Sequence, residues 1–141
     1  MGVAVDAATH TVYVANNENG DSPGNLSMIN ATTCNGTDIS GCSASFPTAP
    51  LGISPRLVAV DTSTGAVYVT DASSPSPSVI NGANCNASMK GGCGTPAIEE
   101  AVGSRPNGIA IDPTSGAVYV MNTLSPGSMS VVRGWRPGAK P

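Results

Sequence analysis

The chain alternates between short apolar runs rich in valine and isoleucine and longer stretches of glycine, serine, threonine, asparagine and proline. Short β-branched runs bounded by turn residues are typical of β-strands, and two such runs joined by a short glycine-containing turn predict a hairpin. The sequence therefore predicts three hairpins. Their strands are residues 3–5 with 12–14, 58–60 with 67–69, and 109–111 with 118–120.

Further strands are expected after each hairpin. Third strands are predicted at 26–30, 78–81 and 129–132. A fourth is predicted around 97–102, and its counterpart in the first part of the chain contains Pro47 and Pro50. Proline is tolerated on edge strands, so the fourth strand should lie at the outer edge. We expect an all-β fold of four-stranded antiparallel units, eleven strands in all.

These units are sequence repeats. LVAVDTSTGAVYVTD (57–71) and GIAIDPTSGAVYVMN (108–122) are near-copies, and GVAVDAATHTVYVAN (2–16) is a third. The repeats measure 55 and 51 residues, and the difference falls in the loop that begins at residue 17. Four strands in about 50 residues describe the blade of a β-propeller, with one internally duplicated β-sandwich as the alternative. The expected divisions are repeats at 1–55, 56–106 and 107–132, the last one partial, and a non-repeat tail at 133–141.

Composition excludes several classes of protein. The net charge is −3 and only 11% of the residues are charged, so no basic surface for nucleic acid is expected. No apolar run approaches the length of a membrane span, and Met1 is not followed by the segments of a signal peptide. The tail holds the single tryptophan, Trp135, which we expect to be incidental.

The four cysteines form two pairs at equivalent repeat positions, Cys34 with Cys42 and Cys85 with Cys93. This favours one local disulfide in each repeat, although three pairings are formally possible. Paired zinc ligands are usually separated by two to four residues, so a metal site is less favoured than a disulfide; free thiols are the other alternative. Disulfides would place the protein in an oxidising compartment, outside the cytosol.

The sequence gives little support to a catalytic function. His10 is the only histidine, and it occupies the turn position that Gly65 and Gly116 hold in the other repeats, so a surface turn role is expected. Asp6, Asp61 and Asp112 recur at the ends of first strands. Together they could hold a cation such as Ca²⁺, but we expect each to accept hydrogen bonds within its own turn. We therefore predict no catalytic, cofactor-binding or metal-binding residues.

The segments VYVAN (12–16), VYVTD (67–71) and VYVMN (118–122) each follow a strand and an Asp-containing turn, and they resemble the signature of the YVTN family of β-propeller repeats. The resemblance extends to YncE-like and surface-layer propellers. It implies an open propeller fragment from a secreted or cell-surface protein. The cysteine-bounded loops then look like a disulfide-bearing variant of the repeat.

Two functions follow from this resemblance. The first is a non-catalytic scaffold that binds a protein or a glycan through its loops. The second is a fragment of a lactonase- or lyase-like propeller enzyme whose catalytic residues lie in other blades. Because eleven strands cannot close a ring, the end sheets should expose apolar faces that support head-to-tail self-association. The faces expected to be exposed carry Val3, Val5, Val12 and Val14 at one end and Ile109, Ile111, Val118 and Val120 at the other.

Overall fold

The structure, a computed structural model, describes residues 1–18, 20, 22–94, 97–98 and 101–136. Within these residues all regular structure is β-strand. The strands are β1 (Val3–Asp6), β2 (Thr11–Asn16), β3 (Pro23–Asn30), β4 (Thr48–Ile53), β5 (Pro55–Asp61), β6 (Ala66–Asp71), β7 (Ser78–Asn81), β8 (Ala97–Ile98), β9 (Pro106–Asp112), β10 (Ala117–Asn122) and β11 (Ser128–Arg133). The predicted all-β class is confirmed.

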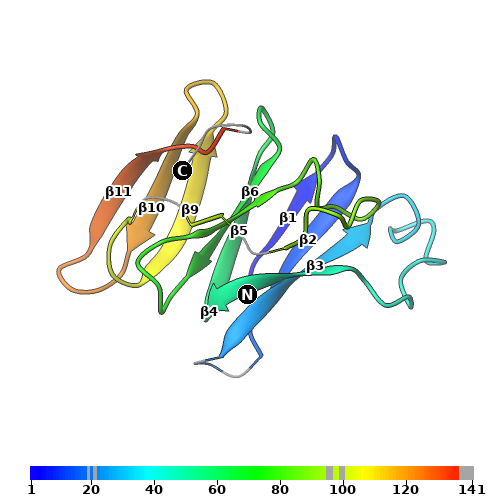
Figure 1. Cartoon of the computed structure of the whole chain (residues 1–141), viewed down its shortest axis with the longest axis horizontal. Helices are drawn as coiled ribbons and strands as arrows, with labels where there is room; N and C mark the ends of the chain where they lie inside the picture. Colours follow the sequence, from blue (N-terminus) through cyan, green and yellow to red (C-terminus); the bar gives the residue numbers. More distant parts are fainter. Residues whose placement is uncertain (19, 21, 95–96, 99–100, 137–141) are drawn as a thin grey trace.

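The strands form three antiparallel sheets that follow one another along the chain. Their orders are β1-β2-β3-β4, β5-β6-β7-β8 and β9-β10-β11, so each sheet is a meander in sequence order. Figure 1 shows the three sheets side by side, with the β5–β8 sheet in the middle. The first strands of neighbouring sheets lie next to each other, β1 beside β5 and β5 beside β9. This arrangement is consistent with an open fragment of a β-propeller.

The hairpin turns form because aspartate and a left-handed residue recur at fixed positions. In the first hairpin, Asp6 Oδ1 accepts a hydrogen bond from the Ala8 N–H at 2.9 Å. The turn closes through a residue with positive φ: 73° at Gly65, 70° at Gly116 and 50° at His10. Glycine adopts this conformation without strain, and histidine is among the residues that tolerate it. His10 is therefore an exposed turn residue, as predicted.

The two cores lie between sheets, and alternating residues of each second strand face opposite neighbours. Tyr13 of β2 belongs to the core between the first and second sheets, together with Val67 and Val69 of β6. Tyr68, which lies between these valines, belongs instead to the core with Val118 and Val120 of β10. In each sheet, we call the face that carries the recurring tyrosine (Tyr13, Tyr68 or Tyr119) the tyrosine face. The opposite face carries the valines on either side of that tyrosine, and we call it the valine face. The tyrosine face of one sheet packs against the valine face of the next.

This alternation corrects one of the predicted end faces. Val3 and Val5 are exposed at the first sheet, as expected. At the third sheet the prediction was wrong: Val118 and Val120 are fully buried, and Ile109 and Ile111 pack against the same core. Because all three sheets stack in the same sense, the last sheet buries its valine face and exposes its tyrosine face.

The last part of the chain also differs from the expectation. The Gly134 N–H donates to the Gly116 carbonyl at 2.8 Å, just as the Gly82 N–H donates to that of Gly65 at 2.9 Å. Trp135 follows and packs against the second core, so it is structural rather than incidental. Residues 137–141 of the predicted tail lie outside the described residues. So do residues 99–100 of the predicted fourth strand, and residues 19 and 21 of the loop that begins at residue 17.

Candidate functional site

A polar pocket of about 460 Å³ lies where second strands end and first strands begin. The β2–β3 loop, the β4–β5 connection, the start of β5, the β6–β7 loop, the start of β9 and the residue after β10 all contribute to it, so it spans all three repeats. The described residues that line it are Asn17, Gly20, Ser54, Arg56, Ala72, Ser73, Arg105, Pro106, Asn107 and Thr123. None of them is aromatic or a large aliphatic residue.

Two segments at equivalent repeat positions contribute to this one pocket: Ser54-Pro55-Arg56 and Arg105-Pro106-Asn107. Ser54 and Arg105 have positive φ angles of 59° and 55°, although neither is glycine. Each carbonyl is held by the loop after the neighbouring second strand, at 2.9 Å from the Ala72 N–H and 3.0 Å from the Thr123 N–H. Non-glycine residues in this conformation are strained and concentrate at functional sites. Both strained residues line the pocket.

The pocket is basic within an acidic chain. Arg56 and Arg105 line it, and the described residues that line it include no aspartate or glutamate. Both arginine side chains are exposed. Guanidinium groups bind carboxylates, sulfates and phosphates through paired hydrogen bonds, because their donors lie in one plane. The arrangement is suited to hold an anion.

Asp71 lies directly before the lining residue Ala72 and is itself buried. Its Oδ2 accepts a hydrogen bond of 2.6 Å from Ser78 Oγ. Its Oδ1 is buried and has no hydrogen-bond partner among the described residues. Burial raises the pKa of Asp71 to about 6, despite the lowering effect of the hydrogen bonds from Ser78 and Gly52. The carboxyl is thus a buried structural group next in sequence to the lining residue Ala72, and it is not among the described lining residues.

The three recurring turn aspartates lie at the opposite ends of their strands from the pocket. Each accepts hydrogen bonds in its own turn, as at Asp61, whose Oδ2 is 2.8 Å from Thr64 Oγ1. Burial alone would raise the pKa of Asp61, but the hydrogen bonds from Ser63 and Thr64 outweigh it and hold the pKa below its ordinary value. The described residues contain no group of three or more His, Cys, Asp or Glu side chains arranged to hold a metal ion.

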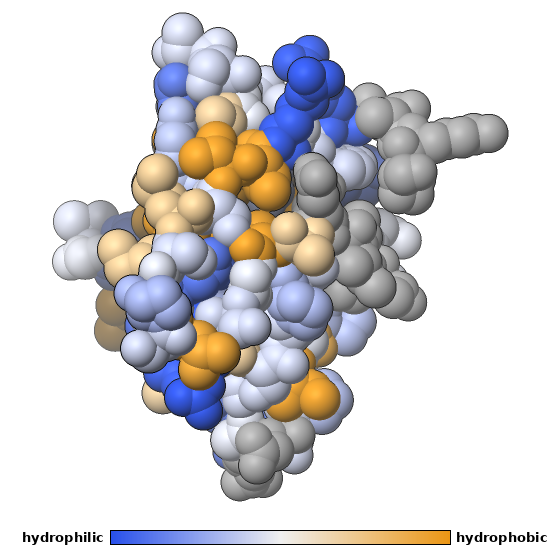
Figure 2. Space-filling model, turned by 90° about the vertical axis from the view of Figure 1, so that its left-hand side faces the viewer, coloured by the Kyte–Doolittle hydropathy of each residue, from blue (hydrophilic) through white to orange (hydrophobic). Residues whose placement is uncertain are grey.

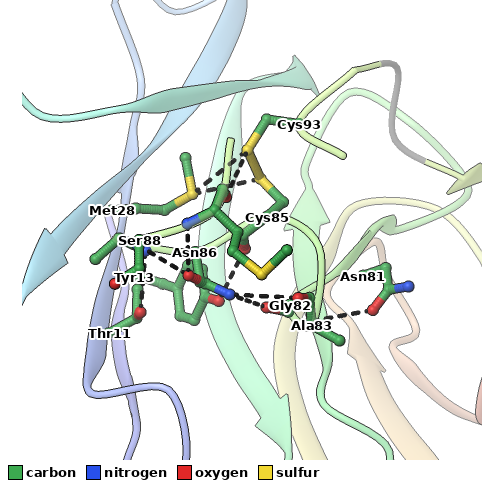
Figure 3. The surroundings of a disulfide bond; sticks show 12 residues. Thr11, Tyr13, Met28, Asn81, Gly82, Ala83, Cys85, Asn86, Ser88 and Cys93 are labelled. Carbon is green, nitrogen blue, oxygen red and sulfur yellow. Dashed lines mark hydrogen bonds between the residues drawn. A yellow bond between two sulfur atoms is a disulfide. The ribbon is translucent and has the colours of Figure 1, made fainter. Parts of the chain in front are cut away.

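Both predicted disulfides are present, Cys34–Cys42 and Cys85–Cys93. They differ in surroundings. The second packs on the tyrosine face of the first sheet, where Cys85 Sγ lies 3.4 Å from Met28 Sδ and the Ala87 N–H donates to Thr11 Oγ1 at 3.1 Å (Figure 3). The loop of the first disulfide has no such cover, and Cys42 is exposed.

Within these loops Asn86 is buried and organises the chain around it. Its amide donates to the Gly82 carbonyl at 2.8 Å, and its Oδ1 accepts from the Ser88 and Met89 N–H groups, each at 2.9 Å. Asn35 makes the corresponding bonds in the first repeat but is exposed. The loops are therefore equivalent in structure and differ only in what covers them.

The sequence did not reveal the pocket, although a signal for it exists. Pro55 and Pro106 are equivalent, and each is followed or preceded by an arginine. Neither the buried position of these prolines nor the positive φ of the residues before them could be read from the pattern.

No protein-family model matches the chain, and no curated protein matches it. In the part of the chain that the structure describes, no helix has the length and hydropathy that crossing a membrane requires.

Proposed function

We propose that this chain is a non-catalytic binding scaffold of the YVTN propeller type, secreted or displayed on the cell surface, which binds an acidic glycan in the pocket between its repeats. The observation that carries the proposal is that Arg56, at the start of β5, and Arg105, immediately before β9, line one polar pocket. The two disulfides support an oxidising location, because such bonds are rare in the cytosol.

An acidic glycan fits the pocket better than a protein segment does. Protein interfaces concentrate their binding energy in aromatic and large apolar residues, and none is found among the described residues that line this pocket. Serine, threonine and asparagine side chains, such as Ser73, Thr123 and Asn107, offer hydrogen bonds to hydroxyl groups. The arginines would then pair with the carboxylate or sulfate groups of the sugar.

Calorimetric titration with acidic oligosaccharides, uronate-containing and sulfated, tests the proposal. Binding should weaken at least tenfold on Arg56→Gln and Arg105→Gln and should weaken further with added salt. Arg133→Gln is the matched control: it removes the same charge from an exposed position on β11, at the end of the third sheet away from the pocket. Binding to neutral sugars alone, or equal loss in the control, would overturn the proposal.

The enzyme alternative calls for a different experiment, because it places the catalytic residues in blades other than those of this chain. The sequence of the full open reading frame separates the two functions. Histidines and carboxylates at channel-facing positions of other blades would favour a lactonase- or lyase-like enzyme, and blades without them would favour the scaffold.

A further inference from the structure

The two interfaces between sheets are built from the same pair of faces. At the first, Tyr13 and Met28 of the tyrosine face pack against Val58, Val67 and Val69 of the next valine face. At the second, Tyr68 and Val79 pack against Val118, Val120 and Val132. One sheet therefore joins the next by a single repeated arrangement, which is heterologous because two different faces meet.

One half of this arrangement is left exposed at each end of the stack. The third sheet presents its tyrosine face, with Tyr119 36%, Met121 60% and Met129 66% exposed. These side chains surround a hollow of about 350 Å³. Figure 2 shows apolar atoms gathered on this side of the molecule. Their counterparts in the first sheet, by strand register, are Tyr13, Ala15 and Leu26, all fully buried.

The first sheet presents the other half, its valine face. Val3 and Val5 are 64% and 59% exposed. By register they correspond to Val58 and Val60 of the second sheet, and Val58 is only 9% exposed there. The chain thus exposes a valine face at one end and a tyrosine face at the other. Inside the molecule, faces of these two kinds already pack against each other at both interfaces between sheets.

We propose that the occupant of the exposed tyrosine face is the valine face of a second copy of this chain, joined head to tail. The incoming copy would also bring its Cys34–Cys42 loop. In the chain itself the equivalent loop covers Tyr13, whose hydroxyl donates to the Cys85 carbonyl at 3.0 Å. In the assembly the Cys34 carbonyl of one copy accepts from Tyr119 of its neighbour, which accounts for a disulfide loop that is exposed in the single chain.

This proposal does not rest on the proposed glycan site and is tested separately. Light scattering should show the average mass of the wild-type protein rising above that of one chain as the concentration is raised. Val3→Asp places a charge on one face and Met121→Asp on the other. Both side chains are mostly exposed in the single chain, so we expect each variant to keep its fold and to remain monomeric, with association weakened at least tenfold.

Mixing the two variants gives the decisive result. Val3→Asp retains an intact tyrosine face and Met121→Asp an intact valine face, so the mixture should form a 1:1 heterodimer and nothing larger. Heterodimer formation also shows that both variants are folded. Leu124→Asp, 52% exposed in the β10–β11 turn, is the matched control and should associate like the wild type. A wild-type protein that stays monomeric, or a single variant that associates as strongly as the wild type, would overturn the proposal.

Discussion

Tyr13 and Cys85 are joined by a buried hydrogen bond although 72 residues separate them. The tyrosine hydroxyl of β2 donates to the Cys85 carbonyl at 3.0 Å, beneath the disulfide loop of the second repeat (Figure 3). Tyr68 makes a related contact one sheet later, where its hydroxyl accepts from the Trp135 N–H at 2.6 Å. In the first two sheets, the recurring tyrosine therefore connects its sheet to the chain segment that follows the third strand of the next.

Removing this hydroxyl should destabilise the protein. Tyr13→Phe leaves the buried Cys85 carbonyl without its partner, and such a loss costs about 1–3 kcal/mol of unfolding free energy. Denaturant unfolding at low protein concentration measures it. The matched variant is Tyr119→Phe, at the equivalent but partly exposed position, which should change stability by less than about 0.5 kcal/mol. Equal losses in both variants would show that the hydrogen bond is not the cause.

The two disulfides should contribute unequally to stability. Closing a loop of this length stabilises a chain by about 2–3 kcal/mol in the chain-entropy account. Replacing Cys34 and Cys42 by serine should cost about that much. Replacing Cys85 and Cys93 should cost more, because Cys85 is fully buried against Met28 and serine would leave polar groups there.

Thermal unfolding of the two double variants, compared with the wild type, measures the difference. Mass mapping of the wild-type protein under non-reducing conditions verifies both bonds first. A larger loss from the Cys34/Cys42 variant would contradict the packing argument.

His10→Gly should stabilise the fold slightly. His10 holds a φ of 50° in a turn where the other repeats have glycine. Relief of that strain outweighs the extra freedom glycine gives the unfolded chain, for a net gain of at most about 1 kcal/mol. Gly116→Ala is the opposite change, and since no atom lies within 4 Å of the added Cβ, any loss it causes comes from the backbone conformation. A loss of several kcal/mol on His10→Gly would reveal contacts of the imidazole.

The strands were predictable from the sequence because alternation of apolar and turn residues fixes where a strand begins and ends. The face of a sheet that packs against the neighbouring sheet was not predictable, because the side chains of Val118 and Tyr119, which point to opposite faces, both suit a buried position. The choice between them depends on the direction in which the sheets stack. That direction becomes evident only when Tyr68 and Val69 are seen in different cores.

The candidate site was less predictable than the fold. Its residues come from separate connections between strands, and its backbone relies on positive φ angles at Ser54 and Arg105. Serine and arginine have no particular preference for that conformation, so no local sequence pattern predicts these positive φ angles. The role of the turn aspartates was easier to predict, because an aspartate that accepts hydrogen bonds in its own turn needs donors only two or three positions away in the sequence.

Asp71 predicts a dependence of stability on pH. Burial raises its pKa from 3.8 in the unfolded chain to about 6 in the folded protein. Between these values the folded state binds more protons than the unfolded state, so the free energy of unfolding falls as the pH rises from about 4 to above 6. At about 1.4 kcal/mol per pKa unit, the ionised carboxylate costs at most about 3 kcal/mol at pH 8.

Asp71→Asn should remove this cost, because the equivalent positions of the other sheets already hold asparagine. Asn16 donates to Ser27 Oγ at 2.8 Å and Asn122 to Ser130 Oγ at 2.9 Å, and Ser78 is the corresponding serine beside Asp71. We expect Asp71→Asn to raise the melting temperature at pH 8 and to change it much less at pH 4. The measurement is thermal unfolding across this pH range.

Asp112→Asn is the control with the opposite sign. The hydrogen bonds from Ser115 and Thr114 hold the pKa of Asp112 below its ordinary value. The ionised form is therefore the one that stabilises the fold, and its contribution is lost as the pH falls below about 4. Asp112→Asn should lower the melting temperature at pH 8, where Asp71→Asn raises it. If both variants shifted stability in the same direction at that pH, the burial of an unpaired carboxylate oxygen at Asp71 would not be the cause.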